Sequence, residues 1–225
     1  MFGAAKVARN VGSTVSSVSF HGYGTKVSGN ASGYTINYPS GTAVNDIAVL
    51  FEYASKSTIP DEYLNPGWTR VLQDTYSIPS YTGRLQVSFK VLTEFDNLTS
   101  VSGIVTGNNM ILLVFRPDAV IAGVSAQGVS YELTTGNPSQ KTIAMAGAEG
   151  PIIGFGWYAS SFVIDPRTSS LTMTETPDNT NNWAFTKHII YNKADTPQSG
   201  TIDMDDESTS PDHGNMLAAF YLKLI

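Results

Sequence analysis

The chain has 225 residues with 13 Lys and Arg against 19 Asp and Glu, a formal net charge of -6, and no cysteine. This composition excludes disulfides, thiolate metal sites and a Cys nucleophile, and the acidic balance without a dense basic stretch argues against nucleic acid as a partner. With 20 glycines and only 14% charged residues, the chain is expected to be a turn-rich β protein.

The N-terminal residues 1–13, MFGAAKVARNVGS, carry two positive charges among small residues and lack the continuous apolar core of a signal peptide. We expect them to form an N-terminal arm before a single domain at 14–225. Two tandem sandwiches, 14–119 and 120–225, are the alternative, although no Pro/Gly/Ser-rich linker separates them. No run of 18 apolar residues occurs, so membrane insertion is not expected.

Short runs rich in Val, Ile, Thr, Phe and Tyr, bounded by turn-forming residues, recur along the whole chain and predict strands. The predicted strands lie near 15–21, 33–38, 46–54, 68–76, 84–93, 109–116, 127–134, 140–146, 151–159, 169–175, 184–192, 200–204 and 215–224. The pattern predicts an all-β fold, an antiparallel β-sandwich of about 12 strands, jelly-roll-like in connectivity.

The strand RLQVSFKVL (84–92) alternates in polarity. Its apolar residues predict a dry face, and Arg84, Gln86, Ser88 and Lys90 between them predict a solvated face. In contrast, DIAVLF and MILLVF are apolar throughout, as expected of strands that are covered on both faces.

Sheet edges are expected at the N-terminal VSSVSF (15–20) and at the C-terminal NMLAAFYLKLI (215–225). Edge strands present unpaired backbone groups, so a native assembly must cover or pair them. The apolar content of the C-terminal strand suits a subunit interface.

The second half of the chain resembles the first. The matches place 45–55 on 150–160, Thr35-Ile36 on Thr142-Ile143, Phe89 on Tyr191 and Met110 on Met216, at offsets of 105, 107, 102 and 106 residues. Because the matches are collinear, the sequence predicts an internal two-fold repeat of a six-strand unit.

Catalytic motifs are absent from the sequence. His21, His188 and His213 have no nucleophile elbow or zinc spacing beside them. Four glutamates adjoin predicted strands and are expected on solvated faces; they are Glu52, Glu94, Glu132 and Glu175. We therefore expect no enzyme and no cofactor, and a polysaccharide hydrolase is the least favoured alternative.

The densest acidic stretch, DMDDESTSPDHG (203–214), is expected to be a loop. Its oxygen ligands Asp203, Asp205, Asp206 and Glu207 are calcium candidates. The spacing does not match a calcium-loop pattern, so a solvated loop without metal is the preferred interpretation.

A sugar site is the second candidate. Trp183 follows Asn181 and Asn182 in an Asn-rich loop, and glycan-binding sandwiches use an exposed aromatic ring together with amide side chains. The competing interpretation makes Trp183 a core anchor like Trp68 and Trp157, because large aromatic side chains dominate burial.

Four segments carry a resemblance to a known family. In order, Asp46–Phe51, Pro66–Thr69, Phe89-Lys90 and Ile111–Arg116 form an apolar strand after Asp, a P-x-G-W-T turn, an aromatic-Lys strand and an apolar strand ending in Phe-Arg. This series, about a third of the chain, resembles bacteriophage virion proteins of the tail, fibre or capsid-associated kind.

The resemblance implies a non-enzymatic structural component of the virion, made in the host bacterial cytoplasm. Its expected partners are other virion proteins and copies of itself, with a trimer favoured, and a host surface glycan. The surfaces expected to face them are the loops at 56–67, 76–83, 176–183 and 204–214. A host-glycan-binding adhesin that uses the same loops is the alternative function.

Overall fold

The computed structural model describes residues 17–27, 35–55, 64–78, 81–102, 109–135, 141–158, 162–164, 170–171, 174–175, 186–191, 198–206 and 214–225. These residues form sixteen strands: β1(Val18–Tyr23), β2(Thr25–Val27), β3(Thr35–Asn37), β4(Ile47–Ser55), β5(Thr69–Ile78), β6(Tyr81–Val91), β7(Ser100–Ser102), β8(Asn109–Pro117), β9(Val124–Thr135), β10(Lys141–Ala148), β11(Ile152–Tyr158), β12(Phe162–Ile164), β13(Thr174–Glu175), β14(Thr186–Tyr191), β15(Gln198–Asp206) and β16(Gly214–Leu224). In this part of the chain, no helix is long and apolar enough to cross a membrane.

The prediction of an all-β antiparallel sandwich is confirmed, and every predicted strand overlaps an observed one. Eleven of the described strands have six or more residues, against about 12 expected. The strands that the sequence did not predict, β2, β7 and β12, are three residues long, too short to show a periodic pattern. The jelly-roll connectivity stays a prediction.

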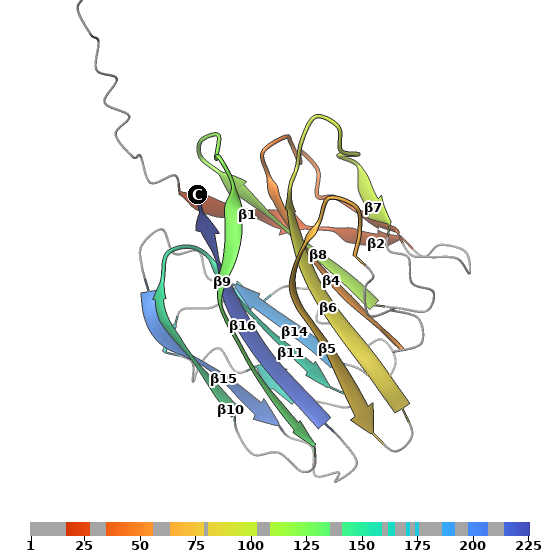
Figure 1. The fold of residues 1–225 in the computed structure, drawn as a ribbon, viewed down its shortest axis with the longest axis vertical. Coiled ribbons are helices and arrows are strands. Elements are labelled where there is room, and N and C mark those ends of the chain that lie inside the picture. Colours follow the sequence, from red (N-terminus) through yellow and green to blue (C-terminus); the bar gives the residue numbers. More distant parts are fainter. Residues whose placement is uncertain are drawn as a thin grey trace, which may run out of the picture.

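The strands form four antiparallel sheets arranged as four layers (Figure 1, from left to right). The layers are β10-β15-β12, then the five-stranded β13-β14-β11-β16-β9, then the five-stranded β1-β8-β4-β6-β5, then β2-β3-β7. We call β1-β8-β4-β6-β5 the first sheet and β13-β14-β11-β16-β9 the second sheet.

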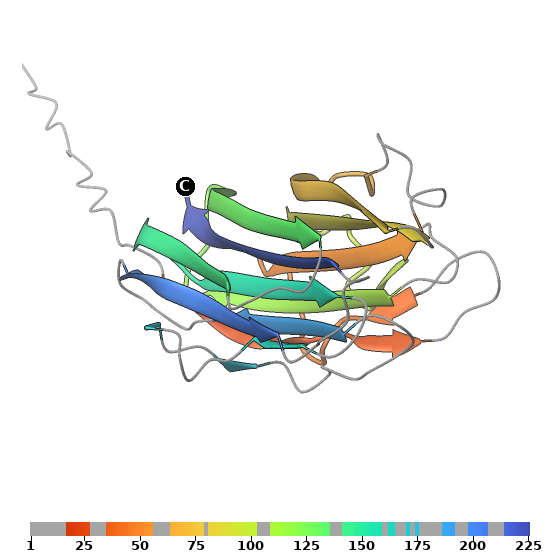
Figure 2. The same cartoon turned by 90° about the horizontal axis from the view of Figure 1, so that it is seen from below.

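The central core lies between the two five-stranded sheets. Val49, Phe51 and Phe115 of the first sheet belong to one buried cluster with Ile153 and Phe220 of the second. Strand β5 contacts β9 and β16, and Figure 2 shows β5 (dark yellow) and β9 (green) along the same upper side of the molecule. Both halves of the chain therefore contribute to a single central core.

The opposite face of each five-stranded sheet is covered by a three-stranded one. On the first sheet, Leu50 and Leu112 pack with Ile36 of β3. On the second sheet, Ala219 packs with Ile143 of β10. Strands β4 and β8 are thus covered on both faces, which confirms the prediction from their unbroken apolar runs.

The solvated face predicted for 84–92 is wrong. Arg84, Gln86 and Ser88 are all buried, because Ser88 lies opposite Leu50 and therefore faces the outer layer of the sandwich, not water. In this strand the apolar residues face the central core, and the polar residues between them form a buried row on the opposite face.

The strand order of the second sheet repeats that of the first. If β1, β8, β4, β6 and β5 are matched with β9, β16, β11, β14 and β13, the two sheet orders coincide. The three-stranded sheets agree in part, since β3 pairs with β7 as β10 pairs with β15.

Register and side-chain direction refine the predicted matches. Val49 and Ile153 both enter the central core and lie opposite Phe89 and Tyr191, so the match of Phe89 with Tyr191 agrees with the structure. By the same register, Tyr53 corresponds to Trp157, one residue before the predicted Tyr158. A slip of one residue reverses every side chain, which periodicity-based matching does not detect.

The same comparison applies to β8 and β3. Leu113 and Phe220 lie opposite Val49 and Ile153, so Met110 corresponds to Leu217 and not to Met216. Thr35-Ile36 and Thr142-Ile143 do correspond, because Ile36 and Ile143 lie opposite Val101 and Ile202 in their outer layers.

The halves differ where β1 ends. Gly24 donates its backbone N–H to the Leu112 carbonyl at 2.9 Å, and the chain then leaves the first sheet for β2. In the second half, β9 continues in its sheet to Thr135. Strand β1 lies at a sheet edge as predicted, but β16 lies between β11 and β9, so the predicted C-terminal edge is wrong.

Candidate functional site

Three loops meet at one end of the first sheet, where β4 begins and β6 and β8 end. They span 38–46, 92–99 and 117–123, and we call them together the loop end (Figure 1, top). The final residue also lies here, since Ile225 exchanges backbone hydrogen bonds with Gly123 in both directions.

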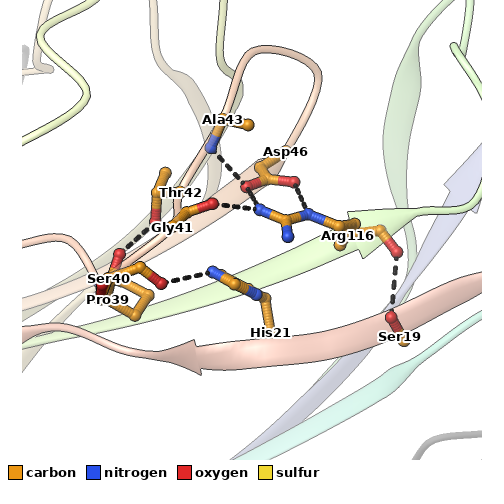
Figure 3. A network of polar contacts seen from close by, with 9 residues as sticks. All are labelled: Ser19, His21, Pro39, Ser40, Gly41, Thr42, Ala43, Asp46 and Arg116. Atoms are coloured by element: carbon orange, nitrogen blue, oxygen red, sulfur yellow. Dashed lines mark hydrogen bonds and ion pairs between the residues drawn. The ribbon is translucent and has the colours of Figure 1, made fainter.

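An ion pair between the partly exposed Arg116 and the buried Asp46 anchors the first loop (Figure 3). Arg116 of β8 donates from Nε to Asp46 Oδ1 at 2.8 Å and from Nη2 to Asp46 Oδ2 at 2.6 Å. Nη2 also donates to the Gly41 carbonyl at 2.6 Å, and Asp46 Oδ2 accepts the Ala43 N–H at 2.8 Å. The hydrogen bonds to Asp46 raise the Arg116 pKa further above its ordinary value.

Further hydrogen bonds fix the shape of this loop. Thr42 Oγ1 donates to the Pro39 carbonyl at 2.8 Å, and His21 Nε2 lies 3.2 Å from the Ser40 carbonyl (Figure 3). Asn45 adopts a left-handed φ of 77°. Its side chain donates to the Ala119 carbonyl at 3.0 Å and accepts the Ile121 N–H at 3.2 Å, which ties the first loop to the third.

The second loop is a capped turn. The N–H and hydroxyl of Thr93 both donate to Asp96 Oδ2 at 2.8 Å, and Lys90 forms an ion pair with Oδ1. Desolvation alone would raise the Asp96 pKa, but the hydrogen bonds from Lys90 and Thr93 outweigh it and lower that pKa. The Tyr38 N–H donates to the Thr99 carbonyl at 2.9 Å, so the first and second loops are also joined.

These fixed loops expose large apolar side chains. The exposed fractions are 90% for Phe95, 89% for Val120, 70% for Ile225 and 50% for Val44. Among the described residues, only Val129 of β9 is a further exposed large apolar side chain. Exposed apolar side chains that gather at one end of a molecule are a candidate for a protein-contacting surface.

A second polar group lies inside the sandwich. Gln73 donates to Gln86 at 3.3 Å, and Gln86 donates to Glu52 Oε2 at 3.3 Å, while Glu52 Oε1 has no hydrogen-bond partner among the described residues. Glu52 is 1% exposed, so its predicted solvated position is wrong. Burial raises its pKa to about 7, against the smaller opposing effect of the Gln86 hydrogen bond.

The stretch 203–214 was expected to be a loop, and its first residues differ from that expectation. Asp203, Asp205 and Asp206 lie in β15, where they pair with Thr142, Val163 and Phe162. In the parts of the chain that the structure covers, no three acidic or histidine side chains form a metal-binding group.

The other predicted positions divide into two groups. Trp183, Asn181, Asn182, Glu207 and His213 lie outside the described residues, as does most of the predicted loop surface. Of the remaining ones, Glu94 is exposed as predicted and Trp68 is a core anchor. His188, Glu132 and Glu175 lie in β14, β9 and β13.

Sequence reasoning missed the loop end. The signal was a large apolar residue inside a turn-forming context, Phe95 in TEFDN and Val120 in PDAVIAG, where a strand pattern does not continue. Comparison of the chain with protein-family models, with curated proteins and with solved structures gave no match.

Proposed function

We propose that the chain is a non-enzymatic structural component of a phage particle, and that the loop end is its contact surface for neighbouring protein. The observation that carries the proposal is the exposure of Phe95, Val120 and Val44 on three loops that are fixed by hydrogen bonds and ion pairs.

The physical argument concerns the cost of association. Large apolar side chains contribute most at the centre of a protein interface. Ordering a mobile loop on binding opposes association, and that cost is small where the loop is already fixed by hydrogen bonds. A loop end with both properties is suited to permanent contact in an assembly.

The resemblance to phage virion proteins supports the same proposal. Asp46 is the first residue of one resembling segment and Arg116 is the last residue of another, and together they form the ion pair that holds the first loop. Lys90 holds the second loop through Asp96, and Trp68 packs in the outer core. The resembling residues thus maintain the scaffold and its loop end.

The proposal includes a homo-oligomer, with a trimer favoured, contacts to other virion proteins and a location in the virion. It also includes origin of the two halves from one duplicated unit, supported by their equal strand order. The glycan-binding adhesin stays the alternative.

Two measurements test the proposal. Light scattering on the purified chain is expected to give a trimer or larger assembly, and Phe95→Ser with Val120→Ser is expected to reduce its mass. Val129→Ser, which changes an exposed apolar residue on β9, is the matched control and should leave the mass unchanged. In particles purified from cells carrying the encoding genome, mass spectrometry should detect the chain. Its absence from the particles would refute the proposal.

A further inference from the structure

The loop end lies beside the start of a segment whose composition complements it. Ser17 is bound to Asp118 in the third loop, since its hydroxyl donates to Asp118 Oδ2 at 2.8 Å and its carbonyl accepts the Asp118 N–H at 2.9 Å. Residues 1–16 therefore enter the molecule two residues from Val120. These sixteen residues lie outside the described structure and are called the N-terminal segment here.

The N-terminal segment is apolar and cationic. Its apolar residues are Met1, Phe2, Val7, Val11 and Val15, its charged side chains are Lys6 and Arg9, and it contains no acidic residue. The loop end presents apolar tips together with the exposed acids Glu94 and Asp118. Both the hydrophobic and the charged character of the two parts are therefore complementary.

Geometry allows the segment to reach all three loops of its own molecule. From the β1 edge to β6, three strand spacings amount to about 14 Å. Sixteen extended residues span up to about 50 Å. A tether this short gives a local concentration of the segment in the millimolar range, well above that supplied by another molecule in dilute solution.

We propose that the loop end is the docking site of the N-terminal segment of the same chain, with Phe95 and Val120 as its apolar contacts and Glu94 as a charged contact for Lys6 or Arg9. This inference deepens the proposed function, because the docked segment then forms part of the surface that meets a neighbour.

Trypsin cleavage at Lys6 and Arg9 of the full-length chain reports on docking directly. Trypsin cleaves only the undocked segment, so the cleavage rate follows the undocked fraction. If the docked state outnumbers the undocked one about ten to one in the native chain, cleavage in the Phe95→Ser, Val120→Ser double variant is expected to be about tenfold faster. Glu94→Lys should also accelerate it, and added salt should do so in the native chain by screening the charges. Val129→Ser is the matched control and should cleave at the native rate, with circular dichroism confirming that each variant folds.

Equal cleavage rates in the native chain and the double variant would overturn the inference. Cleavage of the native chain at several protein concentrations tests the source of the segment, and a rate that does not change with concentration is expected for docking within one molecule. A rate that falls as the concentration rises would show that the segment docks on another copy and would also overturn the inference. Because both readouts use the isolated chain, they are independent of whether the protein is found in phage particles.

Discussion

Arg116 and Asp46 close a two-point ion pair across neighbouring strands, with Asp46 buried and Arg116 partly exposed. The second half has a counterpart at the end of β16, where Lys223 pairs with Glu149, but both of those side chains are exposed. The two halves thus place a cation at the same point of the sheet in different dielectric surroundings.

Arg116→Met is expected to lower the free energy of unfolding by about 3 kcal/mol, because it leaves the buried Asp46 carboxylate without its partner. Lys223→Met, the matched control, is expected to change the free energy of unfolding much less, because an exposed pair contributes little. Urea denaturation of both variants measures the difference. Equal losses would show that the burial of Asp46 does not determine the strength of its pair.

Glu52 is expected to make the fold less stable as the pH rises. Its pKa is raised from the ordinary 4.5 to about 7 in the folded chain, so the folded state favours the protonated acid. The free energy of unfolding that the protonated Glu52 contributes is fully present below pH 4.5. It is lost between pH 4.5 and 7, by about 3 kcal/mol in total.

Glu52→Gln should remove this pH dependence and raise the unfolding free energy by about 3 kcal/mol at pH 8, while changing little at pH 4. Thermal or urea unfolding across this range gives the profile. Glu94→Gln, in an exposed turn, should retain the native profile. If the Glu52→Gln profile kept the native slope, a different group would be responsible for it.

Replacement of Gly24, between β1 and β2, by a residue with a side chain is expected to destabilise the fold. A Cβ atom there would lie 2.6 Å from the Asn37 carbonyl oxygen and against Ile36. Gly24→Ala should therefore cost about 2 kcal/mol. Gly123→Ala, where the nearest atom outside its chain neighbours is the Ile225 Cβ at 3.9 Å, is the control and should be close to neutral. Chemical denaturation distinguishes the two.

Calcium is expected to have no effect on the fold. Asp203, Asp205 and Asp206 are strand residues, whereas calcium sites in proteins are usually built on flexible loops. Thermal unfolding with calcium and with a chelator should give the same midpoint. A midpoint that rises with calcium, and no longer does so in Asp205→Asn, would restore the metal site.

The adhesin alternative makes its own prediction at Trp183. If that function is correct, Trp183→Ala abolishes affinity for host polysaccharide while the circular dichroism spectrum stays native, because a stacking ring is lost and no core side chain is removed. Glycan-array binding measures the affinity. If the variant unfolds instead, Trp183 is a core anchor.

The strands were predictable from sequence because the spacing of apolar residues along a strand follows which of its faces are buried. Ile47 to Phe51 and Met110 to Phe115 are apolar without a break, and the structure covers both faces of their strands. The buried row Arg84, Gln86 and Ser88 was not predictable, because polar residues on alternate positions look the same whether an outer layer covers them or water does. The outer layer on this side is built from β2, β3 and β7, each three residues long, and the sequence predicted only β3 of them.

The candidate site depended on long-range pairing. Asp46 and Arg116 are 70 positions apart, and their carboxylate and guanidinium meet only because β4 pairs with β8 in a fixed register. Composition marks Phe95 and Val120 as apolar, yet it is the fixed loop around each that leaves the side chain exposed. Local sequence carries neither fact.

The single central core sets the order in which the chain can mature during translation. When the ribosome has made β1 to β8, the face that carries Val49, Phe51 and Phe115 has nothing to pack against until β11 and β16 are made. A nascent chain therefore displays a broad apolar surface for the time needed to add about a hundred residues, roughly 5 to 20 seconds. During that time, the second half of a neighbouring chain can fill the same place, so crowded synthesis favours exchanged dimers and chaperone binding.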